Sequence, residues 1–146
     1  MFEVEARLAA RGVTREALVE AGMVLYVPHG LEGGAARERL GALIDRHLRD
    51  PNVAALLVGA LLLEQELVER RERSELASDP VFLVADEIIG MAIAEVIAGT
   101  YARFEFARYD RAKPGILGEL GPFLDDAAAG LIAGCTSRLY SEQVEG

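Results

Sequence analysis

Cysteine is almost absent from this sequence, and tryptophan is missing altogether. The one cysteine, Cys135, excludes an intramolecular disulfide and any metal site built from several cysteines. A chain that uses so little cysteine fits a reducing compartment, and we expect a cytoplasmic protein. Because Cys135 lies in an apolar segment, we expect an inert core thiol.

Basic residues are scarce relative to acidic ones. The chain has 15 Lys and Arg against 24 Asp and Glu, which gives a net charge of −9. Binding to nucleic acid needs clustered cations along the phosphate backbone, so this balance argues against a nucleic-acid partner. The start of the chain also lacks a basic segment followed by an apolar one, and we expect no signal peptide.

Long apolar runs are missing too. The run from Val53 to Leu63 has eleven residues, whereas about 20 are needed to cross a bilayer. The longer segment from Pro80 to Gly99 contains three acidic residues, each costing roughly 2.5–3.5 kcal/mol at mid-membrane. We therefore expect a folded chain without a membrane span.

The apolar residues that are present recur at helical spacing, and strand-like alternation does not stand out. This pattern predicts an all-α, single-domain bundle of about six helices over residues 1–146. Helix start signals are Thr14, Asp50-Pro51 and Asp79-Pro80. The expected helices are two short ones within Phe2–Val27, then Ala35–Leu48, Pro51–Arg73, Pro80–Gly99, Thr100–Arg111 and Pro122–Tyr140. His47 is expected on a helix surface.

Acidic pairs interrupt two strongly apolar segments. Asp86 and Glu87 lie in LVADEIIGMAIAEVIAG, and Asp125 and Asp126 lie in FLDDAAAGLIAG. Neighbouring helix residues project about 100° apart, so Asp86 and Glu87 cannot face one ligand equally. At least one acid is expected to be buried, and an uncompensated buried charge costs several kcal/mol. A metal ion, an arginine or protonation must therefore offset it.

If the two segments pack together, their four carboxylates converge as oxygen ligands that suit Mg²⁺ or Mn²⁺. The alternative is that these acids lie on solvated edges, in arginine bridges, or in a first helical turn favoured by the dipole. Glu64 is a fifth candidate ligand, or simply the point where a helix reaches solvent. Gly90 and Gly130 each follow an aspartate by four residues. They allow close helix packing, leave space beside the carboxylates, or do both.

Positive charge is concentrated between the two acidic segments, at Arg108, Arg111 and Lys113. Lys113 is the single lysine of the chain, against fourteen arginines. Cations beside a carboxylate-bound metal neutralise phosphoryl oxygens, as phosphoryl transfer requires. The alternative is an amphipathic helix with a solvated basic face. His29, in a glycine-flanked loop, is a candidate for proton transfer.

Three segments of this chain together resemble the phosphatidylglycerophosphatase A family. The family pattern is D-E-x-x-G-M, then D-x-x-K-P, then a D-D pair followed by A-G. Here it reads Asp86-Glu87…Gly90-Met91, Asp110…Lys113-Pro114 and Asp125-Asp126…Ala129-Gly130. The match covers about residues 82–134. The resemblance implies an all-helical, Mg²⁺-dependent phosphomonoesterase whose acids are metal ligands.

Within that family, the chain looks most like the archaeal α-ribazole-5′-phosphate phosphatases, which act in assembly of the cobalamin nucleotide loop. AIAEVIAGT, KPGIL, LGPFLDD and LYVPH carry this likeness. Membrane members of the wider family have further apolar spans and an aromatic residue after K-P, where this chain has Gly115. They also have an arginine at the position of Ala107, and here Arg108 lies one residue nearer the aspartate. The missing spans and aromatic residue favour a soluble, nucleotide-like substrate.

The resulting hypothesis is metal-dependent hydrolysis of α-ribazole 5′-phosphate to α-ribazole and phosphate. Its metal ligands, for one or two Mg²⁺ or Mn²⁺ ions, are Asp86, Glu87, Asp125, Asp126 and Glu64. Its catalytic candidates are Asp110, as further ligand or general base, with Lys113 and His29, and its phosphate-binding candidates are Arg108, Arg111 and Lys113.

Two other functions stay open, phosphatidylglycerophosphate hydrolysis and a non-catalytic helical interaction module. The apolar excess, with a mean hydropathy of +0.20, also predicts a homodimer.

Overall fold

The computed structural model describes residues 2–69 and 78–145. Within these ranges it contains seven α-helices and no strand, so the predicted all-α class is confirmed, and the number of helices equals the number of ranges expected from the sequence. The helices are α1 (Val4–Ala9), α2 (Arg15–Leu25), α3 (Gly33–Leu48), α4 (Pro51–Leu63), α5 (Ala85–Ala98), α6 (Ala102–Ala112) and α7 (Pro122–Glu145). A π-helix, η1 (Glu64–Glu69), continues α4, and a 3₁₀-helix, η3 (Gly115–Glu119), precedes α7.

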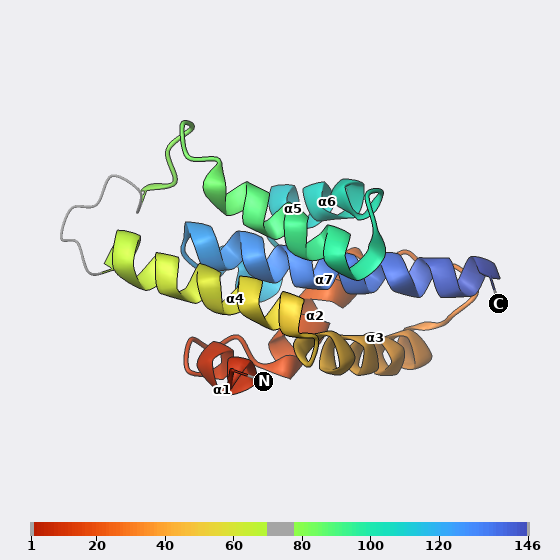
Figure 1. Ribbon diagram of the computed structural model, residues 1–146. Coiled ribbons are helices and arrows are strands. Elements are labelled where there is room, and N and C mark those ends of the chain that lie inside the picture. The colour runs from red at the N-terminus through yellow and green to blue at the C-terminus, as the bar shows by residue number, and fades with distance from the viewer. Residues whose placement is uncertain (1, 70–77, 146) are drawn as a thin grey trace.

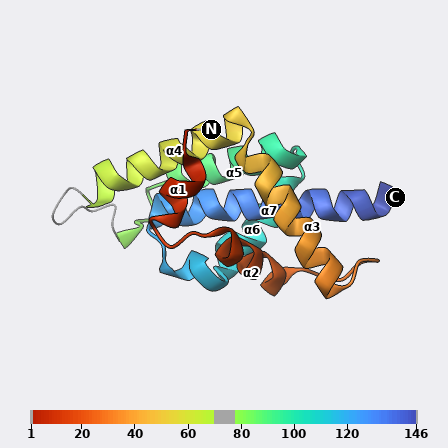
Figure 2. The ribbon, with the colours of Figure 1, turned by 90° about the horizontal axis from the view of Figure 1, so that it is seen from below.

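The long helix α7 is the centre of the bundle. It runs through the middle of the molecule in two perpendicular views, with α5 and α6 above it in Figure 1 and α1, α2 and α3 below (Figures 1 and 2). Every residue from 122 to 136 is buried. A helix that is covered all round must be apolar all round, and this explains its alanines and leucines. Its two aspartates are therefore buried by the same packing.

Two of the three expected helix starts are confirmed. The Thr14 hydroxyl accepts the Ala17 N–H at 3.1 Å at the start of α2. The Asp50 carboxylate accepts two N–H groups of the first turn of α4, and Pro51 occupies the first helical position. Both are the expected way to satisfy N–H groups that have no partner within the helix.

The third start, at Asp79-Pro80, is wrong. Pro80 and Leu83 form a turn instead, and α5 begins only at Ala85. Asp79 adopts a left-handed conformation with φ 52°, which an N-cap residue in extended conformation would not have. In this conformation the Asp79 carboxylate shares a hydrogen bond with Asp86 and does not cap a helix, as described below. At the other ends, α7 continues past Tyr140 to Glu145, and the part of the predicted helix that covers residues 70–73 lies outside the described residues.

His47 is buried rather than exposed, with 7% of its surface accessible, so that prediction is wrong. It follows Leu43 and Ile44 at helical spacing, and the stripe they form faces α7 and α4. Burial lowers the pKa of His47, which favours the neutral imidazole. Cys135 is fully buried, and burial raises the pKa of its thiol, as expected for an inert core residue.

α4 and η1 form one helix that is long and apolar enough to cross a membrane. The segment Pro51–Glu69 has 19 residues, and its most apolar window has a mean hydropathy of 1.4 with 33% of that window buried. Core helices of water-soluble proteins meet the same criterion, so a single such helix is weak evidence for a span. The absence of a membrane span stays a prediction.

Candidate metal centre

α5 and α7 cross with their backbones in contact. A Cβ atom on Gly130 would overlap with the backbone of Gly90, and a Cβ on Gly90 would overlap with the carbonyl oxygen of Asp126 and the ring of Phe106. Close packing through glycine is therefore the role of both residues. Because Asp86 and Asp126 each precede their glycine by one helical turn, the crossing also brings these two aspartates together.

Four aspartates from three helices meet beside this crossing. Asp126 lies within hydrogen-bonding reach of Asp86, Asp110 and Asp125. Asp86, Asp125 and Asp126 are only 1%, 6% and 2% exposed, and Asp110, near the end of α6, is half-buried. These four residues are called the carboxylate cluster below. The structure thus joins residues that lie up to 40 positions apart in the sequence.

The cluster is too crowded for all its members to be ionised without a cation. Burial raises the pKa of Asp125 to about 6, against the opposing effect of Lys113. It raises the pKa of Asp126 further, because a hydrogen bond shared with Asp110 and the neighbouring negative charges act in the same direction. Burial also raises the pKa of Asp86, although its carboxylate accepts the Glu87 N–H at 2.9 Å. Shared protons therefore offset part of the negative charge.

Lys113 offsets another part of the negative charge of the carboxylate cluster. Its ammonium group donates to Asp125 Oδ2 at 2.7 Å and lies 3.3 Å from Asp110 Oδ1. Burial alone would lower the pKa of Lys113, but the hydrogen bond and charge of Asp125 raise it overall. Lys113 also ends α6 in a left-handed conformation with φ 45°, which non-glycine residues seldom adopt. The ion pairs compensate for this strained backbone.

Glu64 approaches the cluster from the end of α4. It is 2% exposed, and its Oε1 accepts the Leu124 N–H at 3.0 Å in the first turn of α7. A Cβ on Gly121 would overlap with the Glu64 carboxylate, so a larger residue there would displace this carboxylate from the Leu124 N–H. Burial raises the pKa of Glu64, and the charge of Asp125 adds to this effect. Glu64 is therefore an acid of the interior, not a residue at the point where a helix reaches solvent.

Two further acids lie at the edge of the cluster. Glu87 is exposed, as the 100° separation from Asp86 predicts, although its pKa is raised by partial burial and then by the charges of Asp110 and Asp86. Asp79 was read from the sequence only as a helix start. In the structure its carboxylate shares a hydrogen bond with Asp86, and its charge also acts on Glu87 and Asp125. No spacing rule would have identified Asp79, because its left-handed turn positions it.

Three predicted residues are not brought into the cluster. Arg108 donates to Glu105 at 2.6 Å and to the Leu25 carbonyl at 2.6 Å, and this fastens α6 to α2. Its guanidinium is thus held by structural partners, and its role as a phosphate clamp stays a prediction. Arg111 is exposed on α6.

His29 is exposed in the loop after α2. Two residues before it, the Val27 N–H donates to the Tyr140 hydroxyl. Tyr140 follows Asp125 by 15 residues along α7, or about 22 Å at 1.5 Å per residue. His29 therefore lies near the far end of α7, and its predicted catalytic role is not supported.

The donor atoms of the cluster fit a divalent cation. Among the described residues, no group of three or more His, Cys, Asp or Glu side chains is arranged so that it could hold a metal ion as the side chains stand. In the same part of the chain, however, Asp125 Oδ1 and Glu64 Oε2 are buried and have no hydrogen-bond partner. Buried carboxylate oxygens without a partner are unfavourable, and a hard cation such as Mg²⁺ or Mn²⁺ would satisfy them. The cluster then has to exchange its shared protons for the metal.

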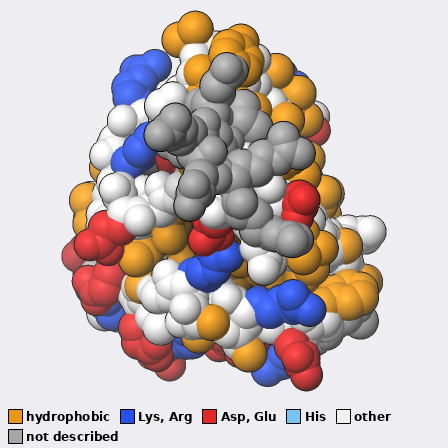
Figure 3. All heavy atoms as spheres, turned by 90° about the vertical axis from the view of Figure 1, so that its left-hand side faces the viewer, with side chains coloured by type: hydrophobic (Ala, Val, Ile, Leu, Met, Phe, Trp, Pro, Cys, Tyr) orange, Lys and Arg blue, Asp and Glu red, His pale blue; other side chains and the backbone are white. Residues whose placement is uncertain are grey.

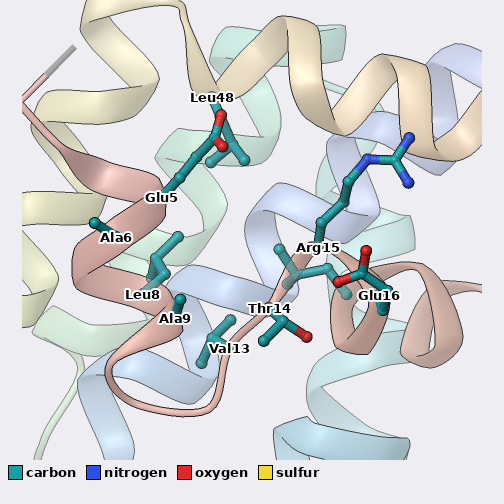
Figure 4. Close-up of a pocket in the computed structure, with 10 residues that line it drawn as sticks. Glu5, Ala6, Leu8, Ala9, Val13, Thr14, Arg15, Glu16 and Leu48 are labelled. Carbon is teal, nitrogen blue, oxygen red and sulfur yellow. The ribbon is translucent and has the colours of Figure 1, made fainter.

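The end of the bundle that holds the cluster presents mixed chemistry. Figure 3 shows this end, where α4 finishes and α5 and α7 begin, with acidic and basic side chains near its middle and hydrophobic side chains along its upper and right-hand edges. A separate pocket of about 350 Å³ lies between α1, the start of α2 and Leu48 (Figure 4). None of the cluster residues lines that pocket, so it is not part of the candidate centre.

A comparison with protein families matches most of this chain, including the residues of the carboxylate cluster. A model of the family described as phosphatidylglycerophosphatase A matches residues 14–141. The chain belongs to this family. The match extends well beyond the three segments that carry the resemblance in the sequence. Membership in the phosphatidylglycerophosphatase A family gives the chain a phosphatase-type function, that of a phosphoric monoester hydrolase in general terms.

Relatives and solved structures agree with the fold. An uncharacterised protein of Methanocaldococcus jannaschii is 44% identical over 126 residues, covering 84% of this chain and 99% of the relative. The low temperature requirement C protein of Listeria monocytogenes has a TM-score of 0.81 at 24% identity, covering 96% of this chain and 94% of that one. A protein of unknown function from Bacillus stearothermophilus has a TM-score of 0.82 at 24% identity, with 95% and 96% covered. At this identity the likeness to the solved structures shows the fold alone.

Proposed function

We propose that this protein is a Mg²⁺- or Mn²⁺-dependent phosphomonoesterase whose substrate is α-ribazole 5′-phosphate. The observation that carries the metal dependence is a pair of buried carboxylate oxygens without a hydrogen-bond partner among the described residues, one on Asp125 of the carboxylate cluster and one on the neighbouring Glu64. The family supplies the reaction type. A reducing, cytoplasmic location and a small-molecule substrate are parts of the same proposal.

The metal ligands in this proposal are Asp86, Asp125, Asp126 and Glu64, with Glu87 and Asp79 at the edge. A bound divalent cation supplies charge stabilisation at the phosphoryl group and a more acidic water. The protein holds these carboxylates on rigid helices, so that little reorganisation is needed during the reaction. Burial on α7 keeps bulk water away from the carboxylates, which strengthens every charge interaction there.

Lys113 and Asp110 act on the substrate side of the cluster. With a divalent cation held by these carboxylates, the Lys113 ammonium would be available to donate a hydrogen bond to a phosphate oxygen. Asp110 is the least buried member of the cluster, so it is the group that can accept a proton from the attacking water. Lys113 contacts Asp110 directly. A phosphate bound by Lys113 would therefore lie next to Asp110.

Phosphatidylglycerophosphate is the second candidate substrate. The loop before α5 exposes Val81 and Phe82, at 100% and 65%, close in sequence to Asp79 and Asp86. Apolar side chains near such a centre would suit a lipid substrate. Gly115, where membrane members of the family carry an aromatic residue, favours the soluble substrate.

The deciding experiment measures phosphate release from both substrates with and without Mg²⁺. The proposal expects α-ribazole 5′-phosphate to be hydrolysed with the higher kcat/KM, and expects EDTA to abolish the reaction. Faster release from phosphatidylglycerophosphate in vesicles would favour the second candidate. Metal-independent hydrolysis would contradict the proposed centre.

We also propose that the protein forms a homodimer through the outer face of α4 and α5. Leu62 on α4 and Ile88 on α5 are more than half exposed, and Val84 and Val96 extend the apolar surface along α5. Because each copy carries a net charge of −9, two copies repel one another unless they meet at a face with little charge. Helix α4 contributes no charged residue to this face, whereas α5 carries Glu87 and Glu95 next to its exposed apolar residues.

A further inference from the structure

A pocket of about 240 Å³ opens beside Glu64, and no member of the carboxylate cluster lines it. Three elements form it: η1, the turn between η3 and α7, and Arg11 from the turn after α1. Its lining residues are Arg11, Glu64, Val68, Glu69, Glu119, Leu120, Gly121 and Leu124. It shares no lining residue with the pocket of Figure 4.

Glu64 links this pocket to the cluster. One carboxylate oxygen is held by the Leu124 N–H, whereas the other, Oε2, is buried without a hydrogen-bond partner among the described residues. The charge of Asp125 acts on Glu64, so the two acids are close. The Glu64 side chain therefore lies between a molecule in the pocket and Asp125, the member of the carboxylate cluster that Lys113 contacts.

The lining suits a molecule that has both apolar and polar surface and carries no negative charge. Val68, Leu120 and Leu124 form an aliphatic wall. Arg11 donates to Glu69 at 2.6 Å, and both side chains are partly exposed. With Glu64 and Glu119, the pocket has three carboxylates and one guanidinium, which disfavours a second anionic group.

We infer that this pocket binds the leaving alcohol of the substrate, a neutral, hydroxyl-bearing ring compound such as a nucleoside, while the phosphate lies at the carboxylate cluster. The inference rests on the proposed function. The aliphatic wall packs against the ring, and the side chains of Arg11 and Glu69 bind its hydroxyl groups. Arg11 precedes residues 14–141, to which the family model matches, so this part of the subsite is not set by the family pattern.

The test uses Leu120→Trp, which fills the pocket, with Val24→Trp on the exposed face of α2 as the matched control. Binding of α-ribazole itself, without phosphate, is measured by calorimetry, and KM is measured for α-ribazole 5′-phosphate and for ribose 5-phosphate. We expect Leu120→Trp to weaken nucleoside binding and raise KM for the nucleotide by about tenfold, equivalent to ~1.4 kcal/mol. The KM for ribose 5-phosphate and all values for Val24→Trp should stay near those of the unaltered protein.

If Leu120→Trp does not fold, Arg11→Met replaces it, with Arg7→Met as its control, and the same loss of nucleoside binding is expected. Absence of α-ribazole binding to the unaltered protein would overturn the inference, and so would equal weakening of both phosphate substrates. Nucleoside binding without any phosphate release would instead contradict the proposed function and leave the subsite standing. The two failures are therefore distinguishable.

Discussion

Gly130 on α7 lies directly against the backbone of Gly90 on α5, with no side chain between them. Each glycine has an aspartate one turn before it, and this contact places Asp86 beside Asp126. The close packing of α5 against α7 and the pairing of the two aspartates therefore depend on the same helix crossing. Substituting either glycine therefore perturbs the crossing while every carboxylate remains in the chain.

Gly130→Ala should destabilise the protein without changing any acid. The new Cβ would overlap with the Gly90 backbone, which cannot move as a flexible side chain can. Overpacking of this kind costs about 1–3 kcal/mol, or roughly 2–4 °C in Tm for each kcal/mol at this chain length. Gly59→Ala in α4 is the control, because its Cβ meets nothing within 4 Å. It should raise Tm through helix propensity. A Gly130→Ala variant as stable as the unaltered protein would contradict the packing argument.

Asp126→Asn should abolish both metal binding and turnover. The amide keeps the shape of the side chain but cannot lose a proton to become a negatively charged metal ligand. With Mg²⁺ at about 100 times its Kd, the unaltered protein gains ~2.7 kcal/mol of stability, and the variant should lose this gain. Activity should fall by on the order of 10²-fold or more. Thermal scans with and without Mg²⁺, together with phosphate release, check both effects.

Glu95→Gln is the matched control for that variant. Glu95 is on the same helix as Asp86 but is partly exposed and pairs with Arg103 at 3.3 Å. Its substitution should leave the Mg²⁺-dependent rise in Tm and the phosphatase activity unchanged. Equal losses in the two variants would mean that the cluster has no special role.

Lys113→Met should weaken phosphate binding more than metal binding. The variant removes the ammonium group that contacts Asp110 and Asp125 and keeps much of the side-chain volume. Inhibition by inorganic phosphate should weaken by about tenfold, which corresponds to the loss of one charged hydrogen bond of ~1.4 kcal/mol. The inhibition constant is measured at saturating Mg²⁺. An unchanged constant would show that Lys113 is purely structural.

The metal-free protein should become less stable as the pH rises. Burial raises the pKa of Asp125 to about 6 and that of Asp126 further, whereas an unfolded Asp titrates near pH ~4. Between those values the folded state binds more protons than the unfolded state, so the free energy of unfolding falls with increasing pH. In EDTA, Tm should therefore drop from about pH 4 to about pH 6 and continue to drop above it.

Saturating Mg²⁺ should reverse this dependence, because the metal binds the ionised carboxylates. Asp126→Asn has no carboxyl group to titrate at this position. In EDTA, its Tm should therefore fall less steeply with pH than that of the unaltered protein. Both expectations are tested by measuring Tm across the pH range, once with EDTA and once with Mg²⁺. A metal-free protein whose stability increases from about pH 5 to about pH 8 would refute the raised pKa values.

A negative charge introduced on the outer face of α4 and α5 should prevent formation of the proposed homodimer. Ile88→Glu places an acid at an exposed apolar position of that face, and burying it against a second copy would be unfavourable. Sedimentation should show a dimer for the unaltered protein and a monomer for this variant. Val24→Glu, similarly exposed on α2, should remain dimeric. A monomer before any substitution would refute the dimer.

The sequence alone determined the helical class, two of the three helix starts and most of the acids in the cluster. These features depend on local rules. Apolar spacing predicts helices, Thr14 and Asp50 satisfy free N–H groups, and an acid within an apolar helix must be compensated wherever that helix packs. The motif order also led to the correct family.

Tertiary structure alone decided which charged groups meet. Lys113 reaches Asp125 because the chain turns sharply after α6, whereas Arg108, only five residues earlier, points to Glu105 and α2. Asp79 comes to the cluster through a left-handed turn that no helical spacing predicts. Ion pairs depend on direction and burial, and both arise only when separate helices pack. The apolar pattern specifies which residues are buried, but the crossing of α5 and α7 decides which of them are neighbours.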